Sequence, residues 1–185
     1  TATSYSNIAT VCIYQGDYAR ALENFEKSLA IREIVLGKNH PDTATSYNGI
    51  GGVYSSQGDY ARALENFEKS LAIYEIVLGK NHPDTATSYN NIGLVYNYQG
   101  DYANALKYLQ KALVIRRIVL GENHPDTAIS YNNIGLVFYS QGDYTRALEY
   151  NQRALAIYER VLGEDHPYVK NTKDIIETIR QRMQS

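Results

Sequence analysis

The sequence of 185 residues is 44% hydrophobic and 21% charged, with a formal net charge of −2 at pH 7. This is the composition of a folded chain with a core, and the slight negative charge gives no electrostatic reason to expect nucleic acid or an anionic membrane as a partner. It contains no apolar run of about 18 residues and no signal-peptide pattern, so we expect neither a membrane span nor a secretory leader.

Cys12 is the single cysteine, which excludes a disulfide within the chain and fits a reducing compartment. We therefore expect a cytoplasmic protein. The opening residues, Thr1 to Tyr5, repeat the text that begins at Thr43, which indicates a piece of a longer array of repeats.

A stretch that begins at His124 and runs through Phe138 recurs along the chain. The same text, lightly edited, begins at His40, at His82 and, more loosely, at His166, so that the four stretches begin 42 residues apart. A fixed period of this length is typical of stacked, nearly identical supersecondary units.

The unit of residues 85–126 predicts a helix, a tight turn and a second helix. Gly100 and Asp101 separate the two helices, because glycine can adopt the left-handed conformation that ends one helix and aspartate can cap the next. The apolar stripe of the first helix falls at i, i+3, i+4 and i+7, in Tyr89, Ile92, Gly93 and Tyr96.

The second helix of this unit is expected to run from Tyr102 to Leu120, and Gly121 supplies its C-terminal cap. Pro125 then fits the first position of the next helix, with Asp126 near the positive end of its dipole. Short connections make paired helices antiparallel neighbours, and adjacent pairs must stack because one pair cannot bury its stripes alone.

The repeated unit resembles the tetratricopeptide repeat, in the 42-residue variety found in kinesin light chains and nephrocystin-like proteins. The residues that carry this resemblance in the third unit are Tyr89, Gly93, Tyr96, Ala105, Leu109 and Ala112. It implies an all-α superhelix of four helix-turn-helix repeats and a capping helix, which we place at residues 1–42, 43–84, 85–126, 127–167 and 168–185.

The last helix differs from the others because only one narrow stripe of it is apolar, in Val169, Thr172, Ile176, Ile179 and Met183. Such a helix is typical of a terminal cap, with one face on the stack and the other in water. The N-terminal repeat has no such cap. Its exposed face could support end-to-end self-association.

We find no set of residues that predicts catalysis, a metal site or a cofactor. The four histidines occupy the same place in successive repeats, too far apart to share one ion, so each is interpreted as a linker residue before a helix-starting proline. Gly37-Lys38 lacks the upstream glycine of a phosphate loop, and Gly49 to Gly52 lies inside a helix. Cys12 takes the place of a packing tyrosine, so we expect a buried apolar residue rather than a nucleophile.

The predicted first helices, residues 1–15, 43–57, 85–99 and 127–141, contain no Lys, Arg, Asp or Glu. In tetratricopeptide arrays these helices line the concave side, so the resemblance implies a groove without formal charge. The candidate groove residues are Asn7, Tyr14, Asn48, Gly52, Ser55, Ser56, Asn90, Asn91, Leu94, Asn97, Tyr98, Asn132, Asn133, Leu136 and Tyr139.

Asn48, Asn90 and Asn132 fall in register and predict a ladder of side-chain amides. Each amide offers a donor and an acceptor, the complement of a peptide backbone unit, so the ladder could hold an extended segment of any sequence. Tyrosines beside it supply large contact area with few rotors to freeze. A purely structural role for the asparagines is the open alternative.

The second repeat has Gly52, Ser55 and Ser56 where neighbouring repeats carry bulkier residues. We expect a hollow there, walled by Tyr14 and Tyr98, that accepts a bulky partner side chain. Drift among recent duplicates would account for the same differences.

These observations predict a non-catalytic scaffold that binds an extended peptide or protein segment. A strongly acidic segment is disfavoured as a ligand, because the groove positions carry no cation. The alternative function is a structural spacer or self-associating segment of a larger protein.

Overall fold

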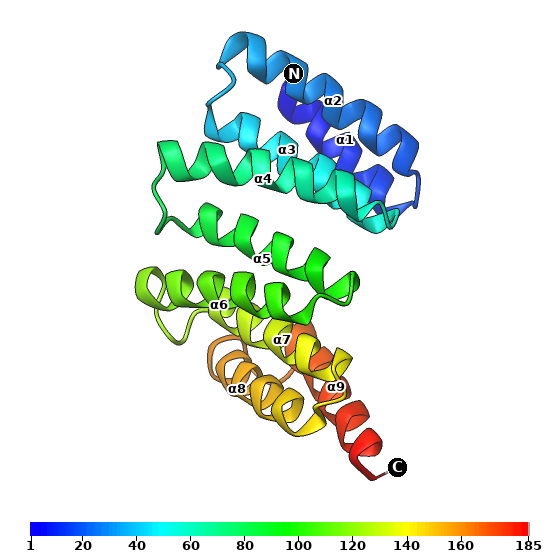
Figure 1. Ribbon diagram of the computed structural model, residues 1–185, viewed down its shortest axis with the longest axis vertical. Coiled ribbons are helices and arrows are strands. Elements are labelled where there is room, and N and C mark those ends of the chain that lie inside the picture. The colour runs from blue at the N-terminus through cyan, green and yellow to red at the C-terminus, as the bar shows by residue number, and fades with distance from the viewer. Residues whose placement is uncertain (185) are drawn as a thin grey trace. The chain divides into compact units, whose positions relative to one another are not determined.

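The computed structural model describes residues 1–184, which form helices and no strand. No helix in this range is both long and apolar enough to cross a membrane. The helices, shown in Figure 1, are α1 (Ala2–Tyr14), α2 (Tyr18–Val35), α3 (Pro41–Ser56), α4 (Tyr60–Val77), α5 (Pro83–Tyr98), α6 (Tyr102–Val119), α7 (Pro125–Ser140), α8 (Tyr144–Leu162) and α9 (Pro167–Gln184).

The prediction of an all-α fold built from helix-turn-helix repeats is confirmed. Consecutive odd-numbered helices from α3 onward begin 42 residues apart, each at a proline, and the even-numbered helices keep the same interval. Within a repeat that lies in one unit the two helices run antiparallel and pack side by side: α1 with α2, α3 with α4 (Figure 1) and α7 with α8. The repeat boundaries between these helices stay a prediction.

The chain falls into two compact units, residues 1–95 and 96–185, and the division lies inside α5. The first unit contains α1 to α4 and most of α5. The second contains the end of α5 and α6 to α9.

The helices begin and end at the predicted capping and turn residues. Asp101 accepts a hydrogen bond from the backbone N–H of Asn104 at 3.1 Å and so caps α6. Gly100, just before it, has a φ of 78°, in the left-handed region where glycine is favoured. The same capping aspartate begins α2, α4 and α8, so each tight turn is specified by local sequence.

The core of the first unit is built from small residues that let the helices approach and larger ones that fill the gaps. Ala9, Cys12 and Ala21 are buried together with Phe25, Ile50 and Val53. Cys12 is 2% exposed, which confirms the prediction that it is a buried packing residue.

The apolar face predicted for α9 is buried except at its end, while its role as a cap stays a prediction. Val169, Thr172, Ile176 and Ile179 are buried, and α9 packs against α8. Met183, which the predicted stripe included, is exposed at the end of the helix.

One buried position near the end of each second helix alternates between arginine and tyrosine, in Arg32, Tyr74, Arg116 and Tyr158. Arg32 on α2 donates through Nη1 to the carbonyl oxygen of Asp42 at 3.1 Å and to Ser46 Oγ at 2.8 Å, both on α3. Arg116 makes the equivalent bonds to α7, and its burial lowers the pKa of its guanidinium. Arg32 and Arg116 therefore tie a second helix to the first helix of the next repeat.

Tyr158 lies against Tyr168, with 5.4 Å between the ring centroids, and burial raises its pKa to about 12. An unfolded tyrosine titrates near 10. Since the folded chain holds this proton to higher pH than the unfolded chain, the stabilisation is complete below pH 10 and is lost as pH rises toward 12.

We therefore expect the free energy of unfolding to fall by about 2 kcal/mol between pH 10 and 12 from this residue. Urea unfolding across that range would show the fall diminished in Tyr158→Phe. Tyr14→Phe, which changes a tyrosine in solvent, serves as the control. Equal pH profiles for wild type and Tyr158→Phe would contradict the assignment.

Candidate binding surface

The first helices carry the predicted binding residues, and the two units present them separately. In the first unit Tyr14 is 87% exposed at the end of α1. Gly52 borders open space, because a Cβ built there would meet no atom within 4 Å. Ser56 donates its hydroxyl to the carbonyl oxygen of Gly52 at 3.0 Å, so it is engaged within α3.

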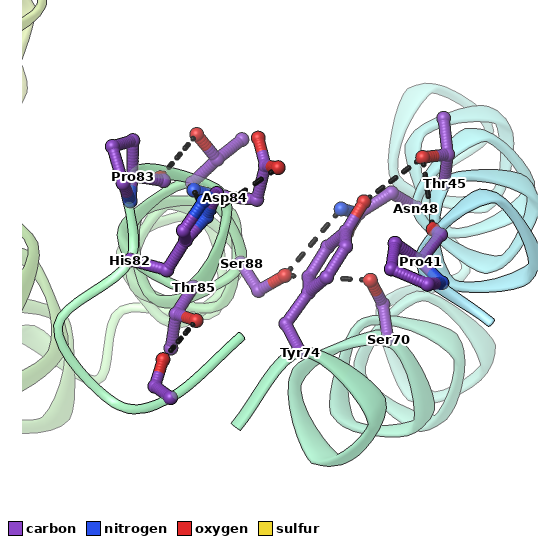
Figure 2. A network of polar contacts seen from close by, with 12 residues as sticks. Pro41, Thr45, Asn48, Ser70, Tyr74, His82, Pro83, Asp84, Thr85 and Ser88 are labelled. Carbon is purple, nitrogen blue, oxygen red and sulfur yellow. Dashed lines mark hydrogen bonds and ion pairs between the residues drawn. The ribbon is translucent and has the colours of Figure 1, made fainter. Parts of the chain in front are cut away.

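Two of the register asparagines, Asn48 and Asn132, link neighbouring first helices. Figure 2 shows the side chain of Asn48 on α3 directed at Ser88 on α5, and Asn48 Nδ2 donates to Ser88 Oγ at 3.4 Å. Ser88 Oγ also lies 3.4 Å from Ser70 Oγ of α4. Asn48 Oδ1 is buried and has no hydrogen-bond partner among residues 1–184.

Asn132 repeats this arrangement in the second unit. Its Nδ2 donates to Thr172 Oγ1 on α9 at 3.3 Å, while Thr172 donates its own proton to the carbonyl oxygen of Tyr168 at 2.7 Å. Asn132 Oδ1 is buried without a partner in the described part of the chain.

The predicted amide ladder stays a prediction, and the contacts of its members favour a structural role. Asn48 and Asn132 already use their donors between helices, and their acceptors are buried rather than presented to a ligand. Asn90 and Asn97 are each 6% exposed, so little of either side chain is accessible to a ligand. This burial and the contacts of Asn48 and Asn132 favour the structural alternative.

A hollow of about 440 Å³ opens between α7 and α9 in the second unit. Its lining includes four predicted residues, Asn132, Asn133, Leu136 and Tyr139. The other lining residues are Gly135 of α7, Asn151 of α8, and Asn171, Asp174, Ile175, Thr178 and Ile179 of α9.

Asn151 of α8 lines this hollow where the first two repeats carry a larger side chain. The corresponding residues of the first two repeats are Phe25 and Phe67, whose rings lie against α3. Asn151 is 2% exposed and folds back to donate to the carbonyl oxygen of Ala147 at 2.8 Å. The shorter asparagine side chain bonds to its own helix and lies close to Gly135 of α7.

The residues contributed by α9 were missed by the sequence analysis, which treated that helix only as a cap. The 42-residue period could have found them, because it aligns Asp174 with Asn132, Ile175 with Asn133 and Thr178 with Leu136. The lining thus gains one carboxylate, at a position where the earlier repeats are uncharged.

The four histidines have a structural task. His40, His82, His124 and His166 each accept at Nδ1, at 3.1 to 3.2 Å, a hydrogen bond from the backbone N–H two residues later. Each therefore caps the first turn of the helix that follows.

The outer face of α1 exposes Ile8 and Val11, whose counterparts Ile50 and Val53 one repeat later are buried. Self-association through this face stays a prediction.

Comparison with known proteins identifies the family of the chain. The tetratricopeptide repeat pattern matches residues 1–76, 47–117 and 84–160, and the chain belongs to this family. No curated protein matches it. Tetratricopeptide repeats generally mediate protein–protein interaction, and members of the family are typically scaffolds without catalysis.

Solved structures share the fold. BtubC (BKLC) from P. vanneervenii is 26% identical, with a TM-score of 0.82 over 97% of this chain and 72% of that one. The nearly identical TPR-like repeats of a Podosopora anserina protein assigned as a kinesin light chain are 22% identical, with a TM-score of 0.77 over 98% and 86%. The Rap protein complexed with competence and sporulation factor is 19% identical, with a TM-score of 0.82 over 97% of this chain and 48% of that one.

Proposed function

We propose that this chain is a non-catalytic scaffold that holds a segment of a partner protein on the exposed surfaces of its first helices. The observation that carries the proposal is the hollow between α7 and α9. It is concave, it is bordered by several polar groups, and its walls include Leu136, Ile175 and Ile179. Mostly apolar hollows with a few polar groups are the usual form of a binding site.

In the first unit the proposed binding surface consists of those predicted groove residues that are accessible to solvent. Tyr14 offers a large, rigid and exposed ring at the end of α1. The hollow proposed at Gly52 and Ser55 is supported by the open space beside Gly52. The Rap protein is complexed with competence and sporulation factor in its solved structure, and we extend to this chain only the proposal that such repeats can hold a partner.

The partner segment is expected to be neutral or basic. The lining of the α7–α9 hollow contains no lysine or arginine and one carboxylate, that of Asp174. An acidic segment placed there would meet repulsion and gain no ion pair.

Selection from a randomised peptide library on the immobilised chain tests this function. Leu136→Arg should remove most of the enrichment because the long side chain fills the hollow. The matched control is Ile118→Arg on α6, where the isoleucine is 73% exposed and lies outside the first helices; it should leave enrichment unchanged. Failure of the wild type to enrich any peptide would favour the structural-spacer alternative.

A further inference from the structure

The lining of the α7–α9 hollow contains one charged side chain, that of Asp174. We propose that the hollow takes the side chain of a lysine or arginine in the partner segment, with Asp174 as the counter-ion, a proposal that rests on the function proposed above. Three features of the hollow support it: the charge of Asp174, the apolar walls and the donors that are already engaged within the protein.

Asp174 is an uncommitted carboxylate. It is exposed on α9 and forms no ion pair with any residue in the range 1–184. The two lysines nearest to it on the helix pair elsewhere: Lys170 Nζ lies 3.4 Å from Asp165 Oδ1, and Lys173 Nζ lies 2.8 Å from Glu159 Oε1. A cation in the hollow would therefore find a partner that no group of the protein already occupies.

The walls suit the long stem of such a side chain. Leu136 faces the hollow from α7, and Ile175 and Ile179 line it from α9. Lysine and arginine lay their methylene stems on apolar surface while the charged head stays with polar groups. The apolar walls and a carboxylate at Asp174 provide for both parts.

Two amides and one hydroxyl around the hollow already donate within the protein. Asn132 Nδ2 donates to Thr172 Oγ1, and Asn151 Nδ2 donates to the carbonyl oxygen of Ala147. Thr178 donates its hydroxyl to the carbonyl oxygen of Asp174 at 2.9 Å. With these donors engaged within the protein, the Asp174 carboxylate acts as an acceptor for an ammonium or guanidinium group, and such charge-assisted bonds are the stronger kind.

The peptides enriched by the wild-type chain provide the probe. We expect them to share a lysine or arginine at one position. For one such peptide, Asp174→Asn should weaken binding roughly ten-fold in fluorescence anisotropy, and replacing the basic residue of the peptide by methionine should weaken it similarly. In the double change the two losses should not add, since both remove the same pair.

Glu177→Gln is the matched control. It removes one negative charge from α9, three residues further along, at an exposed residue outside the lining. We expect it to change the affinity less than two-fold, because exposed charges outside the contact are screened by salt.

The outcomes separate the two proposals. Enriched peptides that share no basic position, or equal losses from Asp174→Asn and Glu177→Gln, would overturn the cation site and leave the binding function in place. Absence of any enriched peptide would overturn both.

Discussion

Arg32→Ala is expected to lower the free energy of unfolding of the chain by about 2–3 kcal/mol. Arg32 is 8% exposed, and its guanidinium bonds to the carbonyl oxygen of Asp42 and to Ser46 Oγ are part of the contact between α2 and α3. Truncation would remove both bonds, leave a cavity and leave polar groups of α3 under-satisfied. Urea unfolding followed by far-UV circular dichroism measures the loss.

The chain supplies its own control for this change. Residues 15–42 and 57–84 are identical except at Arg32 and Tyr74, and Tyr74 OH lies 2.9 Å from Thr45 Oγ1. Thr3 stands where Thr45 stands, one period earlier, so Arg32→Tyr should find the equivalent partner. We expect it to cost less than about 1 kcal/mol. A loss as large as that of Arg32→Ala would show that the position requires the guanidinium itself.

Helix positions could be predicted from this sequence because their signals are local. A proline at the first helical position, a capping aspartate and a glycine with positive φ each act within a few residues. The apolar stripe of α9 could be predicted for the same reason, since periodicity alone identifies the face that is buried.

The binding surface could be predicted only in part. An asparagine in register can reach across to the next helix or face solvent, and residue type alone does not decide between them; the distance from Asn48 to Ser88 does. The lining of the α7–α9 hollow, which includes Asn151 of α8, comes from side chains that are far apart in the sequence. Such packing is set by three helices together, so no single stretch of sequence predicts it.

Gly51→Leu and Gly52→Leu are expected to have opposite effects, although the two residues are adjacent in α3. A Cβ on Gly51 would already lie 2.8 Å from Phe67 Cδ1 and Cε1, and that ring is buried. Leucine there must displace the ring from a packed core, which we expect to cost about 3 kcal/mol. A Cβ on Gly52 meets nothing within 4 Å, so leucine there should add up to about 1 kcal/mol through its better helix propensity.

Urea unfolding of both variants and of the wild type measures the two changes in the free energy of unfolding. The first repeat has Ala9 at the position of Gly51, and there the ring of the equivalent phenylalanine, Phe25, lies in a different place. It packs against Gly49, where a Cβ would be 2.5 Å from Phe25 Cε1. This shift shows how a Cβ at the position of Gly51 can be accommodated. Equal stability of the two leucine variants would mean that Phe67 can make the same shift. Because Gly52→Leu should fold at least as well as the wild type, any loss of peptide enrichment in it reports on the proposed surface of the first unit rather than on unfolding.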